Sequence, residues 1–208
     1  MPINITKTAI NLSYCCNAIS KFSESIQILN AILSLNIKIT PLDKYKILLN
    51  KALAQKNLEQ YENTIQTLHE INDITLADAY LFKVKTLEAN CYKELKQFKY
   101  SLNIYFDLYT EKYCKNSTQH IITLCNIVDL YISIYNLKEA KKYFDKAINL
   151  LSQSCMTIPK YYFIPVYYTL INASKEIHDY DSAITLLTEV LKTAKADKLY
   201  NYQFNSLR

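Results

Sequence analysis

The chain has 208 residues, of which 50% are hydrophobic and 21% charged, so it can bury a core and is not globally disordered. It contains no glycine, which excludes a phosphate-binding P-loop, a dinucleotide fingerprint and a G-x-S-x-G nucleophile elbow, and which disfavours tight β-hairpins. The net charge of +5 includes a single arginine, Arg208, so we expect no direct contact of this chain alone with nucleic acid.

The N-terminal segment leads almost directly into a first helix. MPINITKTAINL lacks a basic region followed by an apolar core, so no secretory signal is predicted, and no helix-turn-helix motif precedes Thr6. No stretch of the chain approaches the ~20 consecutive apolar residues that a membrane helix needs. We therefore expect a cytoplasmic protein that does not contact a membrane.

A seven-position phrase recurs five times along the chain, from Ile19–Ser25 to Ile177–Ala183. It consists of an aliphatic residue, two polar residues, an aromatic residue or leucine, two further residues, and a small residue. The small residues are 39, 37, 39 and 43 positions apart, at Ser25, Thr64, Ser101, Ala140 and Ala183. Such spacing predicts a repeat architecture.

Each phrase joins two predicted helices. Apolar residues follow the small residue at intervals of four and seven, as in an amphipathic helix, and another helical stretch precedes each phrase, at 5–19, 42–57, 77–95, 118–134 and 162–177. We predict one repeat domain, 1–208, with units at 5–38, 41–75, 77–115, 118–156 and 159–195 and a capping helix at 197–208. A fragment end, or a surface completed by another subunit, is an alternative for this tail.

Three prolines mark helix starts in this scheme. Pro41 and Pro159 stand where a helix could begin, and Pro165 should start, kink or break the first helix of the fifth unit. The small residue of the phrase would let the second helix approach the first closely. Because one hairpin cannot bury its apolar stripe alone, neighbouring hairpins should stack into an α-solenoid with a concave face.

The phrase resembles the core of the tetratricopeptide repeat, in which an aromatic residue precedes an alanine by three positions. The resemblance covers nearly the whole chain and implies an all-α, right-handed solenoid whose first helices line a groove. The family's usual glycines are absent, and the units exceed the ~34 residues of the standard repeat. Stretched repeats of this kind resemble those of the Rap, Rgg, NprR, PlcR and PrgX peptide-pheromone receptors of Gram-positive bacteria.

Asparagines recur at equivalent positions of the first helices. Asn11, Asn50 and Asn126 stand fourteen residues before the small residue; Asn90, Asp129 and Asn172 stand eleven before it; and Lys56, Lys93 and Lys175 stand eight before it. An asparagine amide offers a donor and an acceptor, which matches an extended peptide backbone. Alternatively, these asparagines face solvent or cap turns, and the lysines form a solvated face.

Each hydrogen bond contributes about 1 kcal/mol to the binding free energy, whereas micromolar binding needs about 8 kcal/mol. Apolar pockets must therefore supply most of this free energy, with Tyr14 and Tyr168 as candidate pocket walls. The predicted peptide-binding residues are Asn11, Asn50, Asn90, Lys93, Asn126, Asp129, Tyr168 and Asn172.

A carboxylate clamp of the kind that binds chaperone C-termini is not predicted. Asn90 and Asn126 match the two asparagines of that clamp, but Thr86, Pro165 and Thr169 stand where its cations should be.

No metal, cofactor or catalytic site is predicted. None of the six cysteines forms a C-x-x-C motif, and the histidines are far from metal-ligand spacing to them, so reduced, packed thiols are favoured over a zinc or redox site. The leading hypothesis is a non-catalytic module that binds a short peptide or protein segment. It would be the ligand-sensing region of a quorum-sensing-type transcription regulator, with the oligomeric state, a homodimer included, left open. The alternative is a stand-alone scaffold or chaperone for a protein partner.

Overall fold

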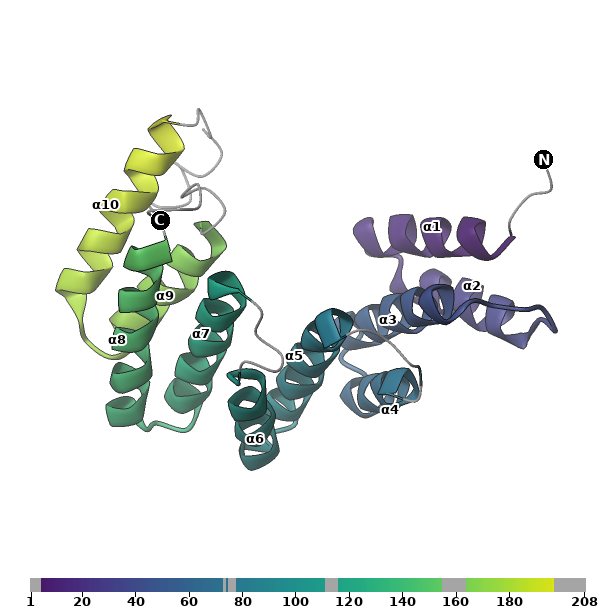
Figure 1. Cartoon of the computed structure of the whole chain (residues 1–208), viewed down its shortest axis with the longest axis horizontal. Helices are drawn as coiled ribbons and strands as arrows, with labels where there is room; N and C mark the ends of the chain where they lie inside the picture. The colour runs from purple at the N-terminus through teal and green to yellow at the C-terminus, as the bar shows by residue number, and fades with distance from the viewer. Residues whose placement is uncertain (1–4, 73, 75–77, 111–115, 155–163, 197–208) are drawn as a thin grey trace. The chain divides into compact units, whose positions relative to one another are not determined.

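The computed structural model describes residues 5–72, 74, 78–110, 116–154 and 164–196 (Figure 1). Over these ranges the chain forms ten helices and no strand: α1 Ile5–Ala18, α2 Phe22–Ser34, α3 Pro41–Asn57, α4 Tyr61–Asn72, α5 Asp78–Glu94, α6 Phe98–Leu108, α7 Ser117–Ser133, α8 Leu137–Ser154, α9 Ile164–Glu176 and α10 Tyr180–Ala196. None of the helices described is long and apolar enough to cross a membrane. The predicted all-α fold of five helix pairs is confirmed.

The chain divides into two compact units, Met1–Ile104 and Tyr105–Arg208, with the boundary inside α6. In the first unit, α1 and α2 both pack against α3, and α4 packs against α5. In the second unit, α7 packs against both α8 and α9. The single domain over 1–208 stays a prediction, and the predicted capping helix at 197–208 and the helix start at Pro159 lie outside the described residues.

The small residues of the phrase are buried where the two helices of each pair meet. Ser25, Thr64, Ser101 and Ala140 have no exposed surface, and Ala183 is 6% exposed. The Ser101 hydroxyl donates a hydrogen bond of 2.8 Å to the carbonyl of Ala89, twelve residues earlier on the first helix of its pair, and Ser25 makes the same contact with Ser13. The predicted close approach of the helices is therefore confirmed.

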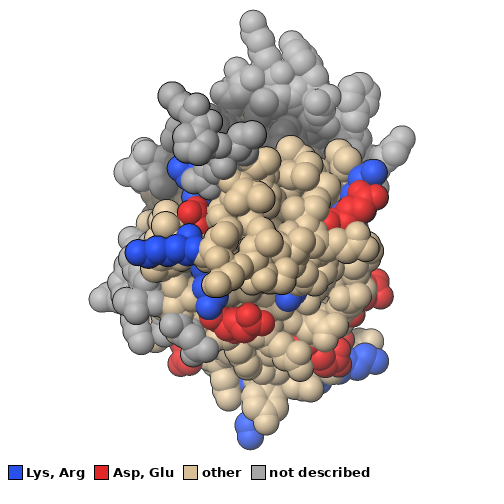
Figure 2. Space-filling model, turned by 90° about the vertical axis from the view of Figure 1, so that its right-hand side faces the viewer, with Lys and Arg blue, Asp and Glu red and all other residues tan. Residues whose placement is uncertain are grey.

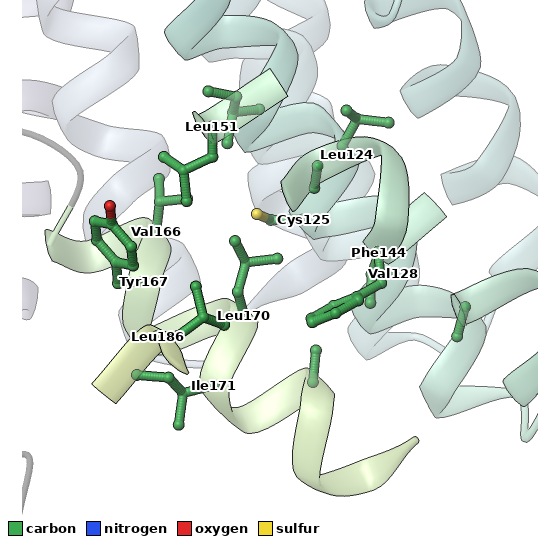
Figure 3. Close-up of a cluster of buried hydrophobic side chains, with 14 of the residues drawn as sticks. Leu124, Cys125, Val128, Phe144, Leu151, Val166, Tyr167, Leu170, Ile171 and Leu186 are labelled. Carbon is green, nitrogen blue, oxygen red and sulfur yellow. The ribbon is translucent and has the colours of Figure 1, made fainter. Parts of the chain in front are cut away.

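Apolar residues of the amphipathic stripes form the cores. In the first unit, one cluster joins α3, α4 and α5 around Leu48, Leu68 and Val84, and another joins α1, α2 and α3. In the second unit, a larger cluster fills the space between α7, α8, α9 and α10 (Figure 3). Phe144 lies in it without exposed surface, at the position four residues after Ala140 where the sequence repeats a large apolar side chain.

All five hairpin turns use the left-handed backbone conformation without glycine. The residue five positions before each small residue has a φ of 58–62°: Ser20, Glu59, Lys96, Tyr135 and His178. At the second turn, the Glu59 N–H donates to the carbonyl of Lys56 at 2.9 Å, and the Gln60 N–H donates to that of Gln55 at 3.0 Å. This pair of bonds is the Schellman motif, which normally favours glycine. The turns therefore keep this geometry although the family's usual glycines are missing, and each turn carries backbone strain.

Side-chain caps fix several helix starts. Pro41 is the first residue of α3, as predicted, and the Thr40 hydroxyl accepts a 3.1 Å hydrogen bond from the Asp43 N–H. α9 begins at Ile164, which places Pro165 in its first turn.

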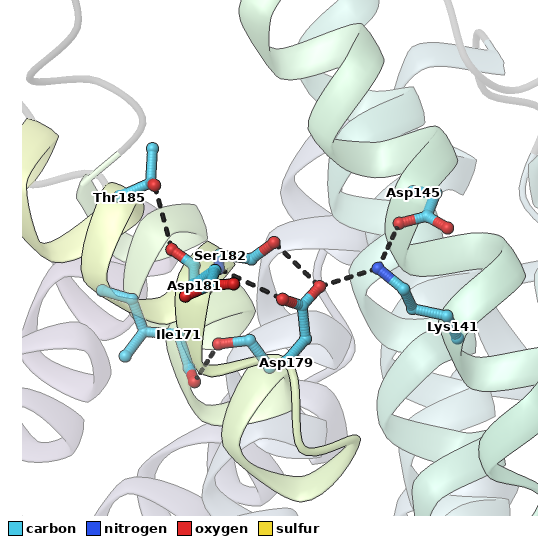
Figure 4. Close-up of polar contacts among 8 residues, drawn as sticks. Lys141, Asp145, Ile171, Asp179, Asp181, Ser182 and Thr185 are labelled. Carbon is cyan, nitrogen blue, oxygen red and sulfur yellow. Dashed lines mark hydrogen bonds and ion pairs between the residues drawn. The ribbon is translucent and has the colours of Figure 1, made fainter.

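Asp179 caps α10 and also joins two hairpins of the second unit (Figure 4). Its carboxylate accepts hydrogen bonds from the Ser182 N–H at 3.1 Å and from the Ser182 hydroxyl at 2.8 Å. Lys141 of α8 donates to the same carboxylate at 2.7 Å and to Asp145 at 2.7 Å. The hydrogen bond from Lys141 lowers the pKa of Asp179.

Candidate functional site

A cleft of about 350 Å³ lies between the first helices of the last two hairpins, α7 and α9. Three of its lining residues come from α7 and four from α9: Asn126, Asp129 and Ile132, and Thr169, Asn172, Ala173 and Glu176. Three residues that the sequence pattern singled out, Asn126, Asp129 and Asn172, are thus brought together.

The repeat register explains why these side chains meet. Residues three, four and seven apart share one face of a helix, and both sets of lining residues have this spacing. Asn126 and Thr169 occupy the same position of successive repeats, fourteen residues before the small residue, and Asp129 and Asn172 share the position eleven before it. Stacking of equivalent helices therefore builds the cleft.

A second pocket of about 400 Å³ adjoins this cleft toward the hairpin turns. Ile132 and Glu176 line both spaces, so the two pockets share part of their walls. The other residues of the second pocket are Ser133, Tyr135, Leu137 and His178. The Tyr135 side chain, in the left-handed turn position, is 91% exposed and adds apolar surface at this end.

The cleft offers hydrogen-bonding groups in a row. Within the described part of the chain, the side chains of Asn126 and Asn172 make no hydrogen bond, so both amides can donate to and accept from a ligand. When ionised, the carboxylates of Asp129 and Glu176 accept hydrogen bonds and cannot donate them. Ile132 and Ala173 provide the apolar part of the lining.

No cysteine lines the cleft among the residues that the structure describes. Cys125 precedes Asn126 but points into the core, and burial, together with the nearby charge of Asp129, raises the pKa of its thiol to about 12. Burial likewise raises the pKa of the Cys91 thiol to about 11. Across the described residues, no group of three or more His, Cys, Asp or Glu side chains could hold a metal ion.

The predicted residues of the first unit have different surroundings. The Asn50 amide donates to Ser13 Oγ at 3.1 Å and to the Ile10 carbonyl at 3.4 Å, so it ties α3 to α1. Asn11 is exposed on α1. Asn90 and Lys93 are half-buried on α5, with the Lys93 Nζ 3.8 Å from a Glu94 carboxylate oxygen. Their contact with a ligand stays a prediction.

The candidate tyrosine walls lie outside the cleft lining. Tyr168 is half-buried and packs against the core of the second unit, whereas Tyr14 is 68% exposed on α1. Sequence reasoning also missed four lining residues, Ile132, Thr169, Ala173 and Glu176. Thr169 shares the register of Asn126, and Glu176 stands seven residues before Ala183, so extension of the register to all residue types would have found both.

Comparison with known proteins shows the fold. No family model and no curated protein matches the sequence. Among solved structures, the nearly identical TPR-like repeats of a Podosopora anserina putative kinesin light chain align with a TM-score of 0.70 and 12% identity, over 92% of this chain and 96% of that one. The chain has a tetratricopeptide-like fold.

Two further structures agree with this assignment. The apo form of RapI aligns with a TM-score of 0.66 and 16% identity, over 100% of this chain and 80% of that one. MamA from Desulfovibrio magneticus RS-1 aligns with a TM-score of 0.56 and 16% identity, over 93% of this chain and 97% of that one. At these identities the similarities establish the tetratricopeptide-like fold alone, and the predicted resemblance at the level of fold is confirmed.

Proposed function

We propose that this chain is a non-catalytic module that binds a short peptide or a protein segment in the cleft between α7 and α9. One observation carries the proposal: Asn126, Asp129 and Asn172, which the repeat register marked as a row, line one cleft of about 350 Å³. A peptide backbone presents alternating donors and acceptors, and an asparagine amide can satisfy one of each.

The two adjoining pockets would supply the binding free energy that hydrogen bonds alone do not. Two amide contacts contribute about 2 kcal/mol at roughly 1 kcal/mol each, against about 8 kcal/mol for micromolar binding. Side chains of the ligand would therefore bury apolar surface against Ile132 and Ala173, and against Tyr135 and Leu137 in the adjoining pocket. A ligand that spans both pockets is an extended segment of several residues.

We further propose that the module is the ligand-sensing region of a peptide-responsive, quorum-sensing-type transcription regulator in the cytoplasm. The stretched repeats resemble those of the Rap-type pheromone receptors, and the fold of RapI covers the whole chain. Contact with DNA would belong to another part of such a regulator.

The test is a titration of short synthetic peptides by fluorescence anisotropy, with a pool of labelled heptapeptides that is then resolved into single sequences. The double variant Asn126→Ala/Asn172→Ala should weaken binding about 10-fold or more, given roughly 1 kcal/mol for each lost contact. Asn149→Ala is the matched control, because Asn149 is exposed on α8 and does not line the cleft. Unchanged affinity in the double variant would refute the assignment of the cleft.

A second function, a scaffold for a folded partner, is favoured by the outer face of α1. Ile5 and Leu12 of α1, and Ile19 directly after it, recur every seven residues and are 52%, 49% and 65% exposed. The face of the molecule on the side of α1 and α2 has a broad central area without charged side chains, with lysines and acids around it (Figure 2). Such a stripe suits a helix of a partner protein or of a second copy. Leu12→Lys should then abolish capture of a folded partner and leave peptide binding unchanged.

A further inference from the structure

The outer face of α1 is open, whereas the first helices of later hairpins are covered by the hairpin before them. α3 packs against both α1 and α2, α5 packs against α4, and α9 packs against both α7 and α8. α1 is the first helix of the described chain. Its exposed apolar residues, Ile5 and Leu12, together with Ile19 directly after it, are called the α1 stripe below.

The repeat register identifies this outer face as the stacking face of a first helix. In α1, the position seventeen residues before the small residue is Thr8, which is exposed together with Leu12 and Cys15, four and seven residues further along the same face. In three later first helices, the same position holds a buried aliphatic residue in a core cluster shared with the preceding hairpin: Ile47 of α3, Val84 of α5 and Val166 of α9. The face that stacks hairpin upon hairpin inside the chain is therefore uncovered on α1.

Ile19 shows the same difference at the end of the helix. The Ile19 N–H donates to the Cys15 carbonyl at 3.1 Å, so the helical hydrogen-bond pattern extends to it. Its side chain is 65% exposed. The aliphatic residue at the equivalent position of every later hairpin is half-buried: Leu58, Leu95, Ile134 and Ile177. The α1 stripe thus carries apolar side chains at positions that the repeat otherwise covers.

The spacing of the α1 stripe is the same in both directions. Leu12 stands seven residues after Ile5 and seven before Ile19, which is the heptad spacing at which two helices pack along a seam. In an antiparallel pair of such helices, Leu12 meets Leu12, and Ile5 of each copy meets Ile19 of the other. An interface about a two-fold axis needs one self-complementary patch, and this spacing provides it.

Charge does not oppose this pairing. Lys7 is the only charged residue of α1. In the antiparallel arrangement the two Lys7 residues are ten positions apart along the helices, about 15 Å, which exceeds the screening length of about 8 Å in physiological salt. A second copy can therefore approach the stripe without a close pair of like charges.

We propose that the α1 stripe binds the α1 stripe of a second copy of this chain, with the two helices antiparallel about a two-fold axis at Leu12. The symmetric spacing is the argument for this occupant, because a different protein would need no such symmetry. The inference goes beyond the proposed peptide binding and does not depend on it. It names the occupant of the face on which a scaffold function would place another protein.

Sedimentation velocity of the purified chain, from micromolar to submillimolar concentration, tests the proposal. The mean mass should rise from 24.3 kDa toward twice that value. Leu12→Glu brings two carboxylates together at the axis and should weaken dimerisation about 100-fold or more. Ile184→Glu is the matched control, because Ile184 of α10 is 62% exposed outside the stripe, and it should leave dimerisation unchanged. Circular dichroism checks that each variant keeps its helices.

Mixed variants test the orientation. Ile5→Glu and Ile19→Lys should each weaken self-association, and an equimolar mixture of the two should recover a heterodimer, because antiparallel helices place position 5 opposite position 19. A mixture of Ile5→Glu with Ile5→Lys should not recover it. Recovery in the second mixture alone would refute the antiparallel arrangement.

The result that overturns the inference is a wild-type chain that stays monomeric at submillimolar concentration, or a dimer that survives Leu12→Glu. A monomer that nevertheless captures a folded protein through Leu12 would support the scaffold function and refute the second copy. The peptide-binding proposal is tested separately, because Asn126 and Asn172 lie on α7 and α9, outside the stripe. Peptide affinity should therefore be unchanged in Leu12→Glu.

Discussion

Replacement of a turn residue by glycine should stabilise this protein. Glu59 and Lys96 are exposed residues with φ values of 58° and 59°, in the left-handed position of their Schellman turns. This backbone costs a residue with a Cβ about 1–2 kcal/mol. Glycine avoids that cost but loses about 0.5–1 kcal/mol through the greater freedom of its unfolded chain. The expected net gain is about 0.5–1 kcal/mol for each of Glu59→Gly and Lys96→Gly.

Thermal and urea unfolding measured by circular dichroism would check this gain. For a chain of this size, 1 kcal/mol corresponds to a rise in Tm of about 2–4 °C. Glu59→Ala and Lys96→Ala are the controls, because they remove the side chain but keep the Cβ, and they should give no gain. Gln60→Gly, one residue later in the turn, should destabilise. Equal stability of the glycine and alanine variants would refute the assigned turn strain.

Three other perturbations follow from the packing and the charges. Phe144→Ala should destabilise the second unit by about 3–5 kcal/mol in urea unfolding, because this side chain has no exposed surface in the core, and a loss below 1 kcal/mol would contradict that packing. Asp179→Asn should cost about 0.5–1 kcal/mol at pH 7 by removing the partly exposed pair with Lys141. The folded pKa of Asp179 is lowered, so its contribution to the free energy of unfolding is present above the ordinary carboxyl pKa of about 3.9. That contribution is lost as the pH falls through the lower folded pKa. The two proteins should therefore converge in stability in acid and not at high pH. Iodoacetamide followed by mass spectrometry should label the exposed Cys15 in the native protein and Cys125 only after unfolding, because burial raises the pKa of the Cys125 thiol to about 12; rapid native labelling of Cys125 would contradict its burial.

The fold was predictable because the repeated pattern reflects local packing and helical periodicity. The small residue must be small where two helices touch, and the apolar stripe must recur at helical spacing, so the phrase predicts both the helices and their pairing. The predicted first helices agree with the observed ones to within two residues at each end. The division into two compact units was not predictable from the sequence. It depends on how the repeats pack against one another, and the repeated pattern shows no break that would mark it.

The site was predictable only in part. The register placed Asn126 and Asn172 on the same face of stacked helices, and both line the cleft. The same register included Asn50, whose amide instead bonds to α1, because Ser13 and the Ile10 carbonyl lie within its reach. Whether an asparagine faces a neighbouring helix or a cleft depends on the inter-helix distance, which one sequence does not contain. Glu176 was missed because it belongs to no repeated asparagine or lysine position, and only a register extended to all residue types includes it.

The most direct test of peptide binding between α7 and α9 is a titration followed through the ¹⁵N-labelled side-chain amides of asparagine by NMR. With a heptapeptide from the binding pool, the amide signals of Asn126 and Asn172 should shift and saturate together, while those of Asn30 and Asn149, exposed on α2 and α8, should stay in place. Saturable binding that leaves the Asn126 and Asn172 signals unmoved would contradict the account.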